Sequence, residues 1–234
     1  MRTATSAGPR PYVHVNCAVS LDGRLAFAGG KRAALSGPRD LERVQALRAD
    51  LGTVLVGVGT VILDDPSLRV HWDMLHRSPG PAPTRVCLDG SGRLPASARL
   101  LDGTQPTIVA TTEHSKRGYP ASVETIVAGA GPEVDLTVLL LELARRGRKG
   151  LLVEGGAHVI ASFLRAGLVD RMTVYVAPVL IGGNTAPSLM AGPESHSSDD
   201  WVELLRESVE ALDGGVLITL RPREPPSEAP PAKL

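Results

Sequence analysis

The stretch from Val54 to His71 constrains the fold more than any other part of this chain. It opens with the apolar, β-branched run Val54–Val56, which is typical of a strand buried on both faces of a mainly parallel sheet. Gly57 and Gly59 follow, and their missing side chains let a ligand approach the backbone and let the chain turn. Open α/β sheets bind ligands at the carboxyl ends of such strands. We therefore expect a strand that leads into a polar loop at a binding site.

The same stretch has a simpler interpretation, as a glycine-rich loop with an ordinary turn at Asp65-Pro66. Two glycines without a third are a weak signal for a dinucleotide site. Thr60 and Asp64 offer a hydroxyl and a carboxylate just beyond the turn, and Pro66 keeps Asp65 out of a helix. Taken alone, the stretch leaves a binding loop and a plain turn equally open.

Composition and proline content indicate how the chain is divided. Of its 234 residues 43% are hydrophobic, enough for one sizeable core, and we expect a single domain over residues 12–220. Residues 1–11 are small, polar and proline-containing, which predicts a flexible lead-in. Residues 221–234 are proline-rich, and we expect a disordered tail because such a run forms neither a core nor a strand ladder.

Charge and cysteine content exclude several functions. The net charge is zero and aromatic residues make up 3%, so we expect neither nucleic acid nor an anionic membrane as a partner. No apolar run is long enough to span a bilayer, and no secretory leader is visible, which predicts a cytoplasmic protein. Cys17 and Cys87 are too few for a zinc site or a disulfide framework, and we expect both to be small buried hydrophobes.

Strand-like runs alternate with helix-like stretches along the body. The expected strands are Tyr12–Ala18, Val54–Val56, Arg85–Leu88, Thr107–Ala110, Glu124–Val127, Leu151–Val153, Met172–Ala177 and Val216–Leu220. The expected helices are one that begins at Pro38 with Ser36 as its cap, Leu136–Arg146 capped by Asp135, and His158–Ala166. This alternation predicts an α/β fold with a mostly parallel central sheet, helices on both faces, and an antiparallel edge formed by the two late strands.

Three of these strands end in polar, glycine-rich segments. Val56 leads to Gly57, Leu88 leads to the turn Asp89–Arg93, and Val153 leads to Glu154 and then Gly155-Gly156 at the start of a helix. A helix that begins after such glycines presents unpaired N–H groups and the positive end of its dipole, which together form an anion site. The alternative is that the paired glycines mark tight packing between strand and helix, without a ligand.

Charged residues near these segments suggest which groups a ligand would meet. Glu154 follows a buried strand, so it needs N–H donors either from a ligand or from an arginine of the protein. Four basic residues surround the first expected helix and could hold a phosphate: Lys31, Arg32, Arg43 and Arg48. Arg43 is the one more typical of a solvated helix face. No metal-ligand spacing, P-loop or nucleophile motif is present, so no metal is expected and the chemistry would come from a cofactor.

Five ordered motifs resemble the pyrimidine reductases of riboflavin biosynthesis. They are V-N-C-A-V-S-L-D-G-R-L-A (15–26), L-R-A (47–49), V-G-V-G-T-V-I-L-D-D-P-S-L-R-V-H (56–71), V-C-L-D-G-S-G-R-L-P (86–95) and L-L-V-E-G-G-A (151–157), and G-L-V-D-R-M-T-V-Y-V-A-P-V-L-I-G-G (167–183) continues the match. The resemblance implies a dihydrofolate-reductase-like fold and a homodimer. It also implies reduction by NADPH of the ribosyl group of an aminopyrimidine ribose phosphate.

The resemblance also implies where the ligands bind. By motif position the NADPH meets Thr60, Asp64, Ser91, Gly155 and Gly156, and neighbouring residues complete the expected cofactor site: Gly57, Gly59, Gly92, Arg93, Leu94, Ala157 and His158. The pyrimidine substrate meets Asn16, Ser36, Arg48, Leu68, His71 and Glu154, to which we add Ser20, Lys31 and Arg32. The hydride would come from the cofactor, so Glu154 is expected to orient the substrate and no catalytic side chain is named.

Two departures from the bacterial bifunctional members of this family bear on the substrate. The chain lacks their zinc deaminase signature, and it has His71 where they tend to have arginine. Both features resemble the stand-alone archaeal and fungal reductases, which act on the diamino pyrimidinone before deamination. The alternatives are the same reduction on the deaminated pyrimidine, a dihydrofolate or pterin reductase, and a nucleotide-binding regulatory module without turnover.

Overall fold

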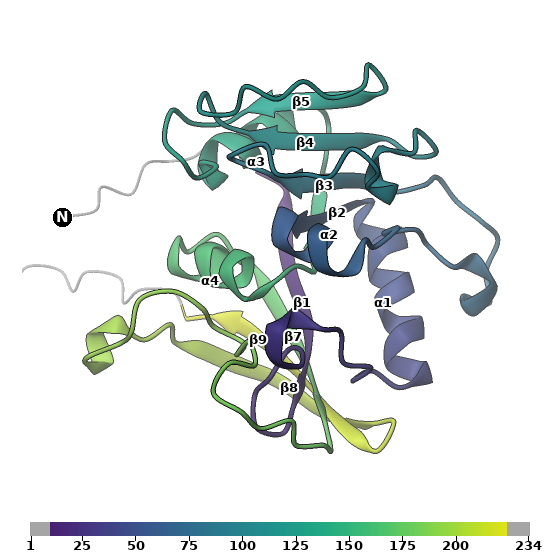
Figure 1. Ribbon diagram of the computed structural model, residues 1–234. Helices are drawn as coiled ribbons and strands as arrows, with labels where there is room; N and C mark the ends of the chain where they lie inside the picture. The colour runs from purple at the N-terminus through teal and green to yellow at the C-terminus, as the bar shows by residue number, and fades with distance from the viewer. Residues whose placement is uncertain (1–9, 224–234) are drawn as a thin grey trace, which may run out of the picture.

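The computed structural model describes residues 10–223, and a nine-stranded sheet organises this part of the chain (Figure 1). The strands are β1 (Tyr12–Ser20), β2 (Thr53–Gly57), β3 (Thr84–Leu88), β4 (Thr107–Thr111), β5 (Val123–Val127), β6 (Gly150–Val153), β7 (Arg171–Ala177), β8 (Leu204–Leu212) and β9 (Gly215–Pro222). Their order is β5-β4-β3-β2-β6-β1-β7-β9-β8. The strands from β5 to β7 in this order are parallel, and β9 is antiparallel to both β7 and β8.

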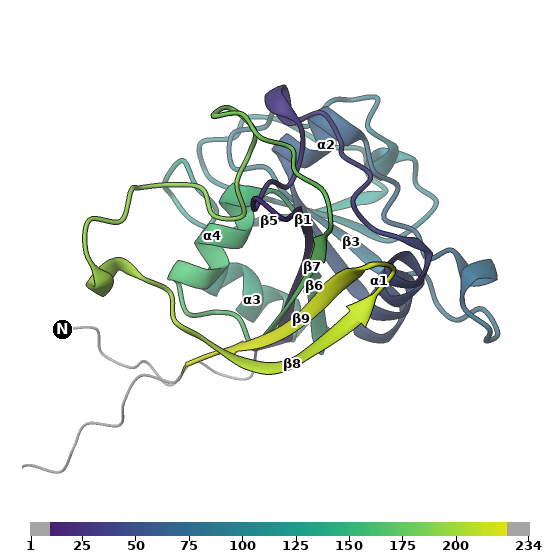
Figure 2. The same ribbon diagram turned by 90° about the horizontal axis from the view of Figure 1, so that it is seen from below.

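Helices cover both faces of the sheet. They are α1 (Pro38–Leu51), α2 (Val58–Asp64), α3 (Leu136–Arg145) and α4 (Ala157–Arg165), with short 3₁₀ turns at Ala28–Gly30, Trp72–Met74, Arg99–Leu101 and Ser198–Asp200. Figure 2 shows α3 and α4 on one side of the sheet and α1 on the other. The expected α/β fold, with a mostly parallel sheet, helices on both faces and antiparallel edge strands, is confirmed. In residues 10–223 no helix has the length and apolar character needed to cross a membrane.

The central strand β2 contributes to both layers of the core, and all of its residues are buried. Leu55 packs into the core that contains α3 and α4, whereas Val54 and Val56 pack into the core that contains α1 and α2. Successive side chains of a strand point to opposite faces, so a strand covered on both sides needs a continuous apolar run. The expectation of a doubly buried strand at this position is confirmed.

The segment after β2 is a helix, where the sequence suggested a polar loop. Val58 and Val61 lie three residues apart and are both buried in the core beneath α2, which fixes one face of this short helix. Asp65 ends the helix in the left-handed conformation at φ 39°, and Pro66 follows it, as expected. The turn signalled by the glycines is therefore confined to Gly57, the residue before the helix.

The start of α1 depends on a residue far away in the sequence. Gly37 occupies the N-cap position that was expected for Ser36, and it provides no side-chain cap. Instead Asp213, in the turn between β8 and β9, accepts a hydrogen bond from the Asp40 N–H at 2.8 Å. A side chain at Gly37 would collide with Asp213, so glycine lets this hairpin turn close over the helix end.

Arg43 belongs to a polar cluster between α1 and the sheet, which corrects the expectation of a solvated helix face. Its guanidinium donates to Asp40 Oδ1 and Asn16 Oδ1, both at 2.7 Å, and its side chain is 20% exposed. The Thr173 hydroxyl donates to the same Asn16 oxygen at 2.8 Å and lies 3.0 Å from Nε2 of His14. Burial and the Arg43 charge lower the pKa of His14 to about 4, so the imidazole stays neutral in this cluster.

Both ends of the folded region extend beyond the expected domain limits. Arg10 is held by a two-pronged ion pair with Asp170, at 2.7 and 2.8 Å. β9 continues to Pro222, two residues past its last pair with β7 at Leu220. At this strand end the missing N–H of proline is tolerated. The remainder of the expected lead-in and tail, residues 1–9 and 224–234, lies outside the described residues.

The strand β8 was not expected. Its sequence, L-L-R-E-S-V-E-A-L, leaves most side chains partly or fully exposed, because it is the outer strand and pairs only with β9. An outer strand of this kind lacks the apolar pattern that marks a core strand.

Replacing Asp213 with alanine should lower the free energy of unfolding by about 1–2 kcal/mol, because α1 loses its cap. Residue 213 also has a positive φ of 49°, which alanine tolerates poorly. Urea denaturation followed by circular dichroism measures the change. The matched variant Asp213→Asn keeps an acceptor oxygen and tolerates this φ, so its free energy of unfolding should fall much less than that of Asp213→Ala. Equal decreases in the two variants would contradict the capping role.

Candidate functional site

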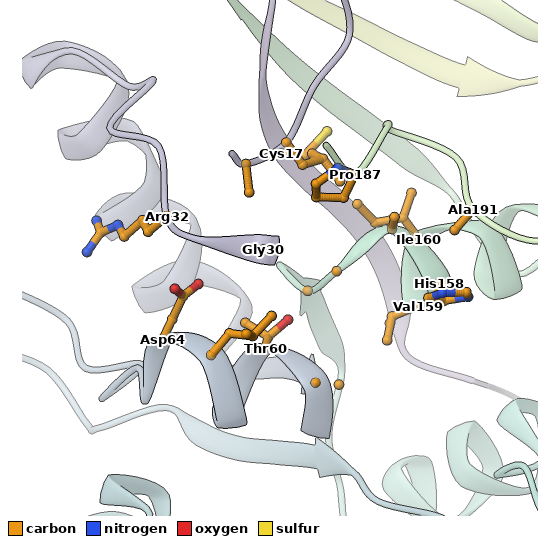
Figure 3. Close-up of a pocket in the computed structure, with 18 of the residues that line it drawn as sticks. Cys17, Gly30, Arg32, Thr60, Asp64, His158, Val159, Ile160, Pro187 and Ala191 are labelled. Atoms are coloured by element: carbon orange, nitrogen blue, oxygen red, sulfur yellow. The ribbon is translucent and has the colours of Figure 1, made fainter. Parts of the chain in front are cut away.

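A cavity of about 1110 Å³ opens where β2 and β6 end (Figure 3). These strands are neighbours, but β2 leads into α2 on one face of the sheet and β6 leads into α4 on the other. The diverging connections leave a crevice at the carboxyl edge, which is where open α/β sheets bind ligands. Its walls come from residues within 17–18, 24–36, 57–64, 154–160 and 184–191, together with Leu41, Leu88, Arg93 and Glu133.

Glycines let the two sides of this crevice approach each other. A Cβ at Gly155 would lie 2.6 Å from the Val56 Cα, and one at Gly57 would lie 2.7 Å from Cγ2 of Val159. Both glycines line the cavity, so tight packing and a place on the binding surface occur together at these positions. Gly59 also lines the cavity, and a Cβ built there meets no atom within 4 Å, so the space beside it is open to a ligand.

The N-terminus of α4 offers donors to an anionic ligand. Gly156 is its N-cap at φ 72°, and no side chain caps the helix. The first N–H groups of a helix lack partners within the helix, and its dipole places partial positive charge there. Gly156, Ala157 and His158 line the cavity, so these donors are at hand for a phosphate group of a nucleotide.

Glu154 is held by an arginine of the protein. Arg48 of α1 donates from Nε and Nη2 to the two Glu154 oxygens at 2.8 and 2.7 Å, and the two side chains are only 15% and 11% exposed. Burial opposes the charge on Arg48, but the Glu154 carboxylate outweighs it and raises the pKa of Arg48. Arg48 also donates to the carbonyl of Arg69 at 2.8 Å, so it ties the segment after α2 to the cavity carboxylate.

The model of the RibD C-terminal domain family matches residues 11–218, which is most of the chain. The chain belongs to this family. The expectation drawn from the sequence motifs is therefore confirmed.

Individual relatives agree with this membership. The chain is 38% identical over 199 residues to the 2,5-diamino-6-ribosylamino-4(3H)-pyrimidinone 5′-phosphate reductase of Methanothermobacter thermautotrophicus, which covers 83% of this chain and 90% of the relative. The reductase of the same name from Archaeoglobus fulgidus is 35% identical and covers 91% of this chain and 98% of the relative. The solved structure of Acinetobacter baumannii RibD superposes with a TM-score of 0.79 at 31% identity, covering 92% of this chain and 58% of that one.

Most of the residues expected at the cofactor in this RibD-family chain line the cavity. They are Gly57, Gly59, Thr60, Asp64, Arg93, Gly155, Gly156, Ala157 and His158. Figure 3 shows Arg32 and Asp64 on one side of the cavity and His158 on the other. Ser91, Gly92 and Leu94 do not line it, although Arg93 between them does, and Leu94 is buried in the core.

Fewer of the residues expected at the substrate reach the cavity. Arg32, Ser36 and Glu154 line it. Four others bond to protein groups: Asn16 to Arg43, Ser20 to Asp22, Arg48 to Glu154, and the His71 N–H to Gln45. Leu68 is buried in the core, and Lys31 is exposed beside Arg32 in the sequence. Except for Asp22, which is two residues from Ser20, these polar partners come from other segments of the chain, so motif position alone did not show them.

The structure adds wall residues that the sequence did not single out. The segment 184–188 borders the cavity beside Arg24, whose guanidinium donates to the carbonyl of Ala186 at 2.9 Å. Asp22 fixes this arrangement, because its carboxylate accepts N–H bonds from Ile181 and Gly182 at 2.9 and 2.8 Å. The family motif at 167–183 ends just before this wall, so it did not indicate residues 184–188.

Cys17 lines the cavity but is not a candidate nucleophile. Burial raises the pKa of its thiol to about 12, so the group stays protonated and packs as a small hydrophobe, as expected. Burial also raises the pKa of the Cys87 thiol in the core. In the part of the chain that the structure describes, no three His, Cys, Asp or Glu side chains gather closely enough to hold a metal ion.

Removing one partner of the Arg48–Glu154 pair should lower the free energy of unfolding more than removing both. Arg48→Met leaves a nearly buried carboxylate without donors, and we expect a loss of about 1–3 kcal/mol in the free energy of unfolding. Adding Glu154→Gln removes the stranded charge and should recover much of that loss. Urea denaturation of the two single variants and the double variant measures the coupling; strictly additive losses would show that the pair contributes nothing.

The Asp22 contact should make stability depend on pH in the acid range. The Ser20 hydroxyl and the N–H groups of Ile181 and Gly182 lower the pKa of Asp22 from its ordinary 3.8 to about 2. A lowered carboxyl pKa stabilises the fold above the unfolded value and loses that contribution as pH falls toward the folded value. The melting temperatures of the wild type and Asp22→Ala should therefore converge between about pH 4 and pH 2; a constant difference across this range would contradict the assignment.

Proposed function

We propose that this riboflavin-biosynthesis reductase uses NADPH to reduce the ribosyl group of 2,5-diamino-6-ribosylamino-4(3H)-pyrimidinone 5′-phosphate to a ribityl group. One observation carries the proposal. A single cavity joins a helix N-terminus suited to a diphosphate with two groups suited to a pyrimidine phosphate: the carboxylate of Glu154, paired with Arg48, and the guanidinium of Arg32, which forms no ion pair with any described residue. Two archaeal relatives that this chain covers almost completely carry the name of this reductase.

The residues present fit a dinucleotide cofactor. The α4 N-terminus, with Gly156 as its cap, would donate N–H bonds to the diphosphate, and the open space beside Gly59 leaves room for it. Thr60 and Asp64 line the adjoining wall on α2. When bound, NADPH would supply a hydride to C1′ of the open-chain imine form of the substrate, and water or the substrate itself would supply the proton to the imine nitrogen. The chain's own task is to hold the two ligands in reacting position.

The structure narrows the choice of residues that would hold the substrate. Arg48 is neutralised by Glu154, so it is a poor partner for a phosphate and acts instead to orient the carboxylate. Glu154 would accept hydrogen bonds from the amino and ring N–H groups of the pyrimidine. Arg32 lines the same cavity, and within the described residues it has no carboxylate within ion-pair distance. It is therefore the cation we assign to the 5′-phosphate, and Ser36 lines the same cavity.

The alternatives differ in what the cavity must recognise. A deaminated pyrimidine carries the same ribose phosphate, so Arg32 would serve it equally. Dihydrofolate carries no phosphate, so in a dihydrofolate reductase Arg32 would have no phosphate to hold. A regulatory module would bind NADPH without oxidising it.

The purified chain with NADPH should show loss of the nicotinamide absorbance when the diamino pyrimidinone phosphate is added. The deaminated phosphate and dihydrofolate are tested in parallel, and we expect little turnover of either. Preference for the deaminated compound would support the proposed reaction but overturn the assignment of the diamino compound as substrate. Turnover of dihydrofolate alone, or binding without any turnover, would overturn the proposed function.

A matched pair of variants tests the assignment of Arg32 to the phosphate. Arg32→Ala should raise KM for the pyrimidine phosphate by about tenfold or more, because a charge-assisted contact to the phosphate is lost. Arg206→Ala removes an exposed arginine from β8, far from the cavity, and should leave KM unchanged. An unchanged KM in Arg32→Ala would remove Arg32 from the phosphate site.

A further inference from the structure

Residues 65–71, which follow α2, do not line the cavity but contact the arginine that holds its carboxylate. We call them the connecting segment. The backbone carbonyl of Arg69 in this segment accepts a hydrogen bond at 2.8 Å from Nη1 of Arg48, whose Nε and Nη2 donate to Glu154. The N–H groups of a guanidinium form a rigid planar fork. The position of the Arg69 carbonyl therefore helps to fix the rotation of the guanidinium that faces Glu154.

The backbone of the connecting segment adopts a conformation that costs free energy. Leu68 has a φ of 52°, in the left-handed region that a leucine rarely adopts, and Asp65 has a φ of 39°. The Leu68 side chain is buried in the core that contains α2. Strained backbone of this kind persists only where the surrounding contacts hold it. The position of the Arg69 carbonyl, one residue after Leu68, thus depends on the anchors of the segment.

The side chain of Arg69 provides an ionic anchor. Its Nη2 donates to Asp102 Oδ2 at 3.0 Å and to the Thr104 hydroxyl oxygen at 2.8 Å. Asp102 is itself held, because the fully buried Arg85 of β3 donates to its other oxygen at 2.9 Å and also to the Thr107 hydroxyl oxygen on β4. Arg69 therefore joins the sheet, through its side chain, to Arg48, through its backbone carbonyl.

Separate contacts hold the two ends of the connecting segment. At its start Asp65 accepts a hydrogen bond from the Arg99 N–H at 2.8 Å, and at its end the His71 N–H donates to Gln45 at 3.0 Å. Neither contact involves the side chain of Arg69, so the fold should survive the removal of that side chain. The removal should instead increase the freedom of the carbonyl at position 69.

We propose that Arg69 is a positioning residue for the substrate: anchored to Asp102, it orients Arg48, and through Arg48 it holds Glu154 in the geometry that receives the pyrimidine. The inference rests on the proposed function, in that Glu154 accepts hydrogen bonds from the pyrimidine. A carboxylate that is already held in its binding geometry loses less freedom when the ligand arrives, so affinity falls when its support is removed. Arg69 does not line the cavity, so it acts on the ligand only through these other groups.

The test compares Arg69→Ala with the matched control Arg77→Ala. Arg77 lies in the same connection between α2 and β3, is 44% exposed against 46% for Arg69, and also pairs with an aspartate, Asp50. Titration calorimetry of the full chain without NADPH, and so without turnover, gives Kd for the diamino pyrimidinone phosphate. We expect this Kd to rise about threefold to tenfold in Arg69→Ala and to stay unchanged in Arg77→Ala. An unchanged Kd in Arg69→Ala, or an equal rise in both variants, would overturn the inference.

Two further measurements separate positioning from a general loosening of the fold. The Kd for NADPH should not change in Arg69→Ala, because the groups assigned to the cofactor lie at the α4 N-terminus and on α2. In a Glu154→Gln background, Arg69→Ala should no longer affect the Kd for the pyrimidine, because the proposed path ends at Glu154. A parallel rise in the Kd for NADPH, or a full additional effect in the Glu154→Gln background, would contradict the positioning role.

The outcomes also distinguish this inference from the proposed function. Thermal melting checks that each variant is folded, and Arg69→Met, which keeps an apolar stem and removes the guanidinium, gives the same comparison with less disturbance. A wild type that binds the pyrimidine without oxidising NADPH overturns the proposed reaction, while the comparison of Kd values still decides the role of Arg69. A wild type that binds no pyrimidine phosphate overturns both.

Discussion

The divergence of the chain at the neighbouring strands β2 and β6 is the constraint on which the rest of the structure depends. Because α2 and α4 leave these strands toward opposite faces, no helix covers the carboxyl edge between them, and a cavity opens there. The close approach of Gly155 to the Val56 backbone keeps the two strand ends together. The groups assigned to the cofactor and the substrate under the proposed function line this crevice or hold a residue that does.

Polar side chains then connect the crevice to elements that are distant in sequence. Arg48 joins α1 to Glu154 at the end of β6, Asp22 joins the segment after β1 to the turn after β7, and Asp89 joins the ends of β3 and β4. Each of these groups is multiply hydrogen-bonded, so losing one partner leaves a charge or a donor unsatisfied. The cavity wall is thus held by a few ionic contacts, while the apolar layers behind it supply the bulk of the packing.

Sequence reasoning worked best where one local rule decides the outcome. The doubly buried strand at Val54–Val56, the Asp135 cap of α3 and the end of α2 before Pro66 were all predicted, because burial pattern, side-chain capping and proline sterics act over a few residues. It failed at Ser36, at Arg43 and at β8. The start of α1 depends on the cap from Asp213, the burial of Arg43 depends on Asn16 of β1, and β8 forms because it is the outer strand of the sheet. None of these partners lies close in the sequence.

The sequence by itself determined the family and the α/β class, because these follow from ordered motifs and hydrophobic periodicity, and it named candidate site residues. Only the tertiary structure decided how those residues are used. Arg48 and Glu154 both looked like ligand contacts, yet they lie 106 positions apart in the chain and satisfy each other. Arg32 and Arg93 line the cavity and form no ion pair with any other residue in 10–223. Whether a charged side chain is available to a ligand depends on which partner the fold places within hydrogen-bonding distance, and that distance is set by packing between remote segments.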